Sequence, residues 1–469
     1  MTATASTASP VPATADVRPV DTTARGALLL QLTLALLWLL AGGTFALIHS
    51  IQLHTPLFFA DFSWFTFGRV QAVMETSLLY GWVANAAFAA SLWLLGRLGG
   101  APARGVGLTA VATVFWNLGV AIAVVLLIGG DLTGNALVQL PLPALPLLLI
   151  SSAIAAASAV YAWADRRTRE TYATQWYAAL ATFVLPWFLS VALTMLALAP
   201  DNGVAETVAA TWTGQGLLLL WLAPLALAAL DYLYPKATGR EVPCYSLAKA
   251  GFWLLVVFGP WAGTRELVGG PFPAWIPALG VAASIVLLVH YAIIAVNLGP
   301  VIGQFFGRSN ALRFGALSVF FYLVLGVAGL VCSLFPLVPW LQFTYVSEAR
   351  TLLMILGVFA PAMFAAIYFL VPRATGKAWA AQGLITQHFR FWALGVLLIA
   401  VGFVGAGLQQ STLFFAPNIQ FTQIDPTLKV WLLLTSAGLG LQLIGTVFLL
   451  VNLGYQIAPG ASTLEGGNS

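Results

Sequence analysis

Twelve stretches of about 20 largely apolar residues follow one another along the chain, and each is long enough to cross a lipid bilayer as a helix. Only 7% of the residues are charged, whereas roughly a quarter are charged in a soluble domain. The stretches are centred near Trp38, Phe88, Ala121, Leu149, Leu185, Leu219, Val256, Ile285, Leu325, Phe359, Leu397 and Thr446. The sequence therefore predicts an all-α polytopic membrane protein with twelve transmembrane helices.

The two ends of the chain differ from this pattern. Residues 1–25 are rich in Ala, Thr, Ser and Pro and have no apolar core, so they do not form a signal peptide. We expect a disordered cytoplasmic tail there, a membrane domain over residues 26–457, and a short cytoplasmic tail over residues 458–469.

The basic residues indicate how the helices are oriented in the membrane. When successive loops are assigned to alternate sides, Arg69, Arg265, Arg350 and Lys429 fall on one side, and the other 15 of the 19 fall on the other side. Because basic residues accumulate in cytoplasmic loops, this bias predicts that both termini are cytoplasmic. The net charge of +4 is spread over short loops, which argues against a nucleic-acid partner.

The chain contains few residues that could carry metal or redox chemistry. It has four histidines and two cysteines, Cys244 and Cys332, which we expect to be buried thiols. It contains no HExxH, CxxC or CxxCH motif and no phosphate-binding loop. It also shows no strong internal repeat of the kind found in many transporters.

Several motifs resemble, in order and spacing, those of the catalytic subunit of cbb3-type cytochrome c oxidases, in the haem-copper oxidase superfamily. Nitric oxide reductase catalytic subunits are a related, slightly poorer match. The motifs are Phe67-Gly68-Arg69, Gly81-Trp82-Val83-Ala84-Asn85-Ala86, Trp212-Thr213-Gly214-Gln215, Tyr234-Pro235-Lys236, Trp261-Ala262-Gly263, Tyr368-Phe369-Leu370-Val371-Pro372-Arg373 and His388-Phe389-Arg390-Phe391-Trp392. The resemblance implies the twelve-helix bundle of oxidase subunit I.

The resemblance also implies where this family holds two haems and a copper ion, for which it needs six histidines. The two ligand positions of the low-spin haem fall on Met74 and Leu352, and that of the high-spin haem falls on Arg350. The three copper-ligand positions fall on Gln215, Arg265 and Glu266. The position of the active-site tyrosine falls on Gly259. Leucine offers no donor, and guanidinium has no free lone pair. We therefore expect no haem, no copper and no catalytic residue in this chain.

The four histidines do not fall on these ligand positions. We expect His49 and His54, just past the first helix, to be solvated or hydrogen-bonded at the interface. We expect His290 to bond to a neighbouring helix, and His388 to have a structural role in a cytoplasmic loop.

Four charged residues lie at or beside the former ligand positions. Because charges within a bilayer are costly and usually pair, Glu75, Arg265, Glu266 and Arg350 are predicted to form an ion-pair network close to Gln215. The alternative places the last three in hydrated loops or at helix ends. Bulky side chains such as Trp261, Met74 and Leu352 would fill the haem volumes, or a lipid or quinone would enter them.

The leading functional hypothesis is a non-catalytic, haem-less membrane subunit that anchors redox partners in a respiratory complex. Membrane-anchored or periplasmic c-type cytochromes, which carry haem c, are the partners that the resemblance implies. The loops around residues 54–67 and 409–429 would be the docking surfaces. The alternatives are a quinol-binding subunit that uses the emptied haem pocket, and a proton- or ion-conducting protein. An active cytochrome c oxidase or nitric oxide reductase is less favoured.

Overall fold

A computed structural model describes residues 18–198, 203–307, 309–417 and 419–458. Within these residues the protein is a bundle of helices without strands, and twelve helical segments are long and apolar enough to span a membrane. They are Arg25–His54, Phe67–Gly99, Val106–Gly129, Leu145–Ala164, Ala173–Leu198, Val204–Thr238, Tyr245–Leu267, Trp275–Ile302, Asn310–Ser333, Tyr345–Thr375, Gln382–Phe414 and Ile424–Ile457. Each contains one of the twelve predicted centres, so the predicted all-α membrane fold is confirmed.

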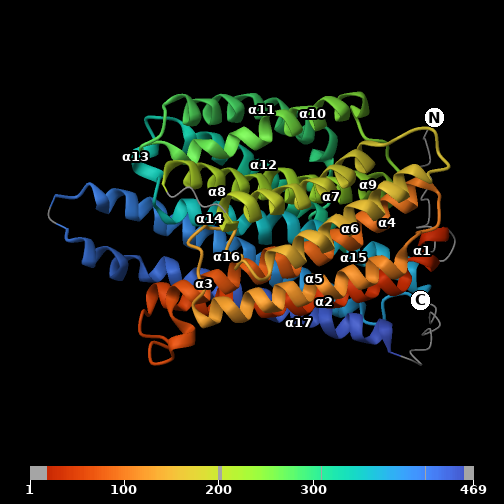
Figure 1. The fold of residues 1–469 in the computed structure, drawn as a ribbon, viewed down its shortest axis with the longest axis horizontal. Coiled ribbons are helices and arrows are strands. Elements are labelled where there is room, and N and C mark those ends of the chain that lie inside the picture. Colours follow the sequence, from red (N-terminus) through yellow and green to blue (C-terminus); the bar gives the residue numbers. More distant parts are fainter. Residues whose placement is uncertain (1–17, 199–202, 308, 418, 459–469) are drawn as a thin grey trace, which may run out of the picture.

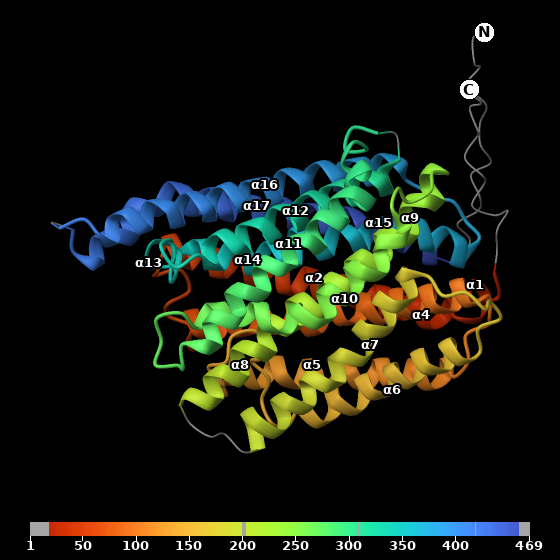
Figure 2. The same ribbon diagram turned by 90° about the horizontal axis from the view of Figure 1, so that it is seen from above.

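The helices run side by side along the long axis of the molecule (Figure 1). Helix α1 (Pro19–Thr23) and the end of α17 (Ile424–Ile457) lie at the same end, which we call the terminal end; the opposite end is the far end. At the far end, α16 (Gln382–Phe414) and α17 project beyond the other helices as a hairpin (Figure 2).

Three spans form the centre of the bundle. In the second, sixth and tenth spans, 100%, 89% and 89% of the residues in the apolar core are buried, against 39–56% in the other nine. A helix that is buried all round must be apolar all round, and runs such as residues 217–230 meet this requirement. The three spans that carry most of the former ligand positions are therefore those that the other helices surround.

The three central spans share one local geometry. Each contains a π-helical segment, namely η2 (Ser77–Val83), η4 (Leu217–Leu222) and η6 (Met354–Phe359). A 16-residue α-helix follows each one, namely α4 (Ala84–Gly99), α9 (Ala223–Thr238) and α15 (Ala360–Thr375). Segment η6 contacts both η2 and η4. Such π-bulges are rare and concentrate at functional sites.

The ends of these helices also match. Each stops at a glycine with left-handed backbone, Gly100, Gly239 or Gly376, with φ of 66°, 67° and 70°. A basic residue, Arg97, Lys236 or Arg373, lies in each last turn, where it interacts favourably with the helix dipole. The three central spans thus repeat one backbone pattern, while the absence of a strong repeat of the transporter kind stays a prediction from the sequence. The repeat lies in backbone geometry and in a few terminal residues, which is why it is faint in the sequence.

The boundary expected for the N-terminal tail is also wrong. Residues 19–23 form α1, in which Asp21 is fully buried and ion-paired with Arg97. Asp21 also accepts a hydrogen bond of 2.7 Å from the indole of Trp93. Residues 18–24 therefore pack against the bundle. The parts of the expected tails at residues 1–17 and 459–469 lie outside the described residues.

Candidate functional site

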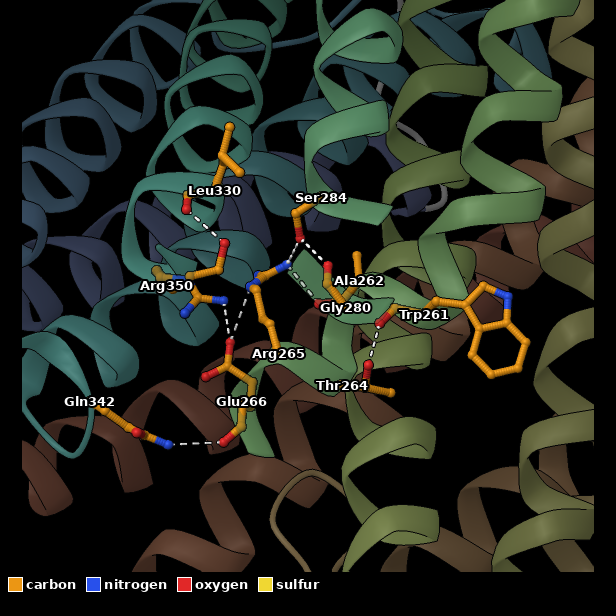
Figure 3. Close-up of polar contacts among 11 residues, drawn as sticks. Trp261, Ala262, Thr264, Arg265, Glu266, Gly280, Ser284, Leu330, Gln342 and Arg350 are labelled. Atoms are coloured by element: carbon orange, nitrogen blue, oxygen red, sulfur yellow. Dashed lines mark hydrogen bonds and ion pairs between the residues drawn. The ribbon is translucent and has the colours of Figure 1, made fainter. Parts of the chain in front are cut away.

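Three of the four predicted network residues lie together at the far end of the seventh and tenth spans (Figure 3). Arg265 and Glu266 belong to η5 (Gly263–Leu267), a 3₁₀ turn that continues α10 (Tyr245–Ala262); Arg350 belongs to α14 (Tyr345–Leu353). Oε1 of Glu266 lies 2.6 Å from Nη2 of Arg350 and 3.5 Å from Nε of Arg265. One carboxylate oxygen is thus shared by two guanidinium groups.

Further hydrogen bonds fix the cluster to neighbouring elements (Figure 3). Nη1 of Arg265 donates to the carbonyl oxygen of Ala262 at 2.9 Å and to the hydroxyl of Ser284, in α11 (Trp275–Ile302), at 3.0 Å. The amide of Gln342 donates to the backbone oxygen of Glu266 at 3.0 Å. The cluster therefore ties the end of α10 to α11 and α14.

The cluster is mostly withdrawn from solvent. The side chains of Arg265, Glu266 and Arg350 are 10%, 24% and 15% exposed. Two cations and one anion sum to a formal charge of +1. A buried charge without a counter-charge is costly, so this excess is the main electrostatic feature of the site.

A small cavity of about 50 Å³ lies beside the cluster. Its polar lining consists of Gln215, Arg265, Ser284, Tyr291, Tyr322, Arg350 and Thr351. Because a water needs roughly 10–15 Å³ on this measure, the cavity has room for roughly four waters. That is less than a haem or a substituted quinone ring requires, so neither fits the space as it stands.

Glu75 does not join the cluster, contrary to the prediction. Its Oε2 accepts a hydrogen bond of 2.8 Å from the backbone N–H of Leu137, and its Oε1 accepts one of 3.3 Å from the amide of Gln71. Both oxygens are thus used within the second span and by the loop that follows α5 (Val106–Gly129). The structure brings together Arg265, Glu266 and Arg350, with Gln215 on the same cavity, and leaves Glu75 elsewhere.

The remaining former ligand positions are apolar and buried. Met74 and Leu352 are each 4% exposed and belong to the main core, and Gly259 is buried within α10. Trp261 is 43% exposed, so the expectation that it fills an emptied haem volume is wrong. The side chain points away from the bundle centre because Trp261 lies on the outer face of α10.

The residues at the former ligand positions do not fit a haem or a copper ion. Leu352 offers no donor atom to pair with Met74, and Arg265 and Arg350, at two other positions that the resemblance gives to ligands, both line the small cavity. Guanidinium remains protonated and has no lone pair to give, so it would repel a metal cation. Among the described residues, no three His, Cys, Asp or Glu side chains group closely enough to hold a metal ion.

Two of the four histidines are engaged with neighbouring helices deep in the bundle. His290 bonds the carbonyl oxygen of Gly251 and the hydroxyl of Tyr322, each at 2.8 Å. Its expected bond to a neighbouring helix is therefore present. His388 lies inside α16, fully buried, with its Nδ1 2.7 Å from the hydroxyl of Tyr368. The expectation that it occupies a loop is wrong, because α16 begins six residues earlier at Gln382.

The other two histidines lie in the last two turns of α2 (Arg25–His54), not beyond it. His49 is buried against the ring of Phe67, with ring centroids 4.6 Å apart. His54 bonds the hydroxyls of Thr55 and Ser436. Both are at the far end, whereas His388 is near the terminal end, so these histidines cannot share one metal ion. Cys244 and Cys332 are free thiols, each half-buried.

A second, larger cavity lies at the terminal end. It has a volume of about 570 Å³, and Arg97, Asp231, Tyr232, Lys236 and Tyr245 are among its lining residues. The lining of this cavity contains acidic, basic and apolar side chains. Asp231 and Lys236 both line it, and nothing in the sequence pattern indicates a cavity between them.

Sequence reasoning also missed the neutral polar residues of the small cavity. Ser284, Tyr291 and Tyr322 lie in the middle of apolar runs and belong to no motif. One signal could have indicated Ser284 and Tyr291, because polar residues seven apart lie on the same face of a helix.

Comparison with known proteins agrees with this architecture. The family model described as cytochrome c and quinol oxidase polypeptide I matches residues 27–441. The cbb3-type cytochrome c oxidase subunit CcoN1 of Stutzerimonas stutzeri is 23% identical, over 82% of this chain and 83% of its own. A cytochrome c oxidase subunit 1 homolog of Azorhizobium caulinodans is 24% identical, over 82% of this chain and 72% of its own.

A solved structure of a heme-copper terminal oxidase dimer has the same fold. Its TM-score is 0.74 at 14% identity, and the match covers 93% of this chain and 84% of that chain. The family model spans most of the chain, including all three central spans, and the expected resemblance is confirmed. This twelve-helix membrane protein belongs to the cytochrome c and quinol oxidase polypeptide I family.

Proposed function

We propose that this chain is a haem-less, non-catalytic member of its family that serves as a membrane scaffold in a respiratory electron-transfer complex. One observation carries the proposal: an Arg265–Glu266–Arg350 cluster and a cavity of about 50 Å³ stand where the family's metal ligands are expected. A subunit with these side chains keeps the fold but has no means of binding oxygen at a metal.

The ion pairs supply a connection that metal ligation would otherwise make. In the parent family, ligands from several helices meet at the metals and so hold those helices together. Here Glu266 links the turn after α10 to α14 through a charge-assisted hydrogen bond of 2.6 Å. A buried cluster of this kind fixes helix positions even where it adds little net stability.

The proposed partners are membrane-anchored or periplasmic c-type cytochromes, which would carry haem c. The far end presents apolar side chains suited to docking: Leu57, in the loop after α2, is 84% exposed, and Phe343, just before α14, is 85% exposed. Exposed apolar groups of this size are common at interaction sites. In this proposal the far end is periplasmic, and both termini are cytoplasmic in a bacterial inner membrane.

The partner proposal is tested by purifying the tagged full chain from its native membranes under mild detergent. We expect a co-purifying protein that stains for covalently bound haem c. Substituting Leu57 and Phe343 with Ser should release that protein while leaving the chain in the membrane. Exposed positions that face lipid, such as Val125→Ser and Val289→Ser, serve as matched controls. Haem c retained equally in all variants, or absent from the wild-type complex, would contradict docking at the far end.

Quinol binding is a second candidate, favoured by the 570 Å³ cavity at the terminal end rather than by the former haem site. The cavity has apolar walls for a ring and polar groups, among them Asp231 and Tyr245, to orient it. Solvent extraction of the pure protein tests this: a stoichiometric quinone that is lost in Asp231→Ala would support it. Proton or ion conduction stays a prediction from the sequence.

A further inference from the structure

We propose that the Arg265–Glu266–Arg350 cluster binds a small monovalent inorganic anion, such as chloride or nitrate, in the adjoining cavity. The proposal goes beyond the scaffold function, on which it rests only in that the cavity must be free of haem and copper.

Charge balance is the first argument. Glu266 offers Oε1 to both arginines, at 2.6 Å and 3.5 Å, so the three side chains retain a net charge of +1. All three are more than three-quarters buried, and they lie within two segments that are apolar enough to span a membrane. A single charge in such surroundings is strongly destabilising unless a counter-ion neutralises it. A monovalent anion would bring the cluster to neutrality.

The cavity lining provides the second argument. The described residues that line it include both guanidinium groups but no carboxylate. Gln215 adds an amide and Tyr291 adds a hydroxyl. The hydroxyl protons of Ser284 and Tyr322 are already donated to the carbonyl oxygen of Gly280 and to Nε2 of His290. N–H and O–H donors that converge on a space without acceptors of negative charge favour an anion over a cation.

Unused hydrogen-bonding capacity points the same way. Nε of Arg265 is buried and makes no hydrogen bond within the described structure, since its 3.5 Å approach to Glu266 is an ion-pair contact only. The side chain of Arg265 is 10% exposed. Buried donors in native proteins normally have a partner at hydrogen-bond distance, and the carboxylate at 3.5 Å satisfies this one poorly, so Arg265 retains capacity for a further acceptor.

The size of the cavity defines the class of ligand. A volume of about 50 Å³ admits roughly four waters, or one small ion with part of its hydration shell. A halide or a planar oxyanion such as nitrate fits this limit. Larger organic anions such as gluconate do not, and this difference supplies the control for the experiment.

The test is chloride binding to the full-length chain in detergent, measured by the line width of the ³⁵Cl NMR signal. We expect the wild-type protein to broaden the signal, nitrate to reverse the broadening by competition, and gluconate at equal ionic strength to leave it unchanged. Arg350→Gln brings the formal charge to zero, so chloride affinity should fall at least about tenfold. Arg69→Gln is the matched control, because Arg69 lies at the same end but bonds backbone carbonyls of Ser63 and Ile128.

Glu266→Gln should change the chloride affinity in the opposite direction, so it provides a second test if Arg350→Gln does not fold. It raises the formal charge to +2, so chloride should bind more tightly than in the wild type. No broadening by the wild-type protein, or equal broadening by the wild type, Arg350→Gln and Glu266→Gln, would overturn the proposal. Haem is quantified on the same sample: bound haem b would contradict the scaffold function, whereas absent haem without chloride binding would contradict the anion site alone.

Discussion

Oε1 of Glu266 lies 2.6 Å from Nη2 of Arg350, although 84 residues separate the two in sequence. The pair joins the turn after α10 to the first half of the tenth span, one of the three spans that form the centre of the bundle. The sequence resemblance places the family's metal ligands in those regions. The ion pair therefore joins these two segments at the place where metal coordination would otherwise join them.

Removing the shared carboxylate should be more damaging than removing the whole pair. Glu266→Gln leaves two buried arginines facing each other, and we expect it to reduce stability by roughly 2–4 kcal/mol. Glu266→Gln with Arg350→Gln restores the wild-type formal charge of +1 and should cost less. Unfolding of the purified variants in detergent measures the difference. A double variant that is less stable than Glu266→Gln alone would contradict the electrostatic account of the cluster.

Glu75 should behave independently of this cluster. Because its carboxylate bonds Leu137 and Gln71, Glu75→Gln keeps an acceptor for the backbone N–H and should change stability by about 1 kcal/mol or less. When Glu75→Gln is combined with Arg350→Gln, the change in the free energy of unfolding should equal the sum of the two single changes to within about 0.5 kcal/mol. A double-mutant cycle checks this, and a coupling well above that value would place Glu75 back in the network.

The contact of α1 with the bundle should be essential for stability. Asp21 and Arg97 form a fully buried ion pair, so Asp21→Ala is expected to lower the free energy of unfolding by roughly 2–4 kcal/mol. Asp165 pairs with Arg104, whose side chain is 70% exposed, and Asp165→Ala should cost less than about 1 kcal/mol. Thermal unfolding of both variants compares them. Equal effects would mean that α1 does not pack as described.

Close glycine packing should hold the α16–α17 hairpin together. A Cβ on Gly438 would lie 2.6 Å from the carbonyl oxygen of Gly395, whereas a Cβ on Gly440 would meet nothing within 4 Å. Small residues at such crossings let membrane helices approach closely. Gly438→Ala should therefore destabilise by about 1–3 kcal/mol, and Gly440→Ala should be nearly neutral. Protease sensitivity of the hairpin in detergent is the readout; indistinguishable variants would contradict the helix crossing.

The twelve spans followed from the sequence because the length of an apolar run is set by the thickness of the bilayer. The meeting of Arg265, Glu266 and Arg350 followed from the family register, together with the cost of burying single charges. Glu75 could not be placed this way. It lies one residue after the ligand position at Met74, and a step of one residue along a helix rotates the side chain by about 100°. Its partner, the backbone N–H of Leu137, also leaves no signal in the sequence.

Other features depended on packing that no local pattern records. The helical residues 19–23 are short and polar, and only the buried partners of Asp21 explain why they fold against the bundle. The small cavity arises from Ser284, Tyr291 and Tyr322 on two different helices, so their shared role appears only once α11 and α12 (Asn310–Ser333) are packed together.

The central claim is tested most directly by a reduced-minus-oxidised absorption spectrum and a metal assay on the purified single subunit. Because Leu352, Arg350, Arg265 and Gln215 stand at the former ligand positions, we expect no b-type haem bands and no copper. A stoichiometric b-type haem would contradict the account, since it would require axial donors that these side chains do not offer.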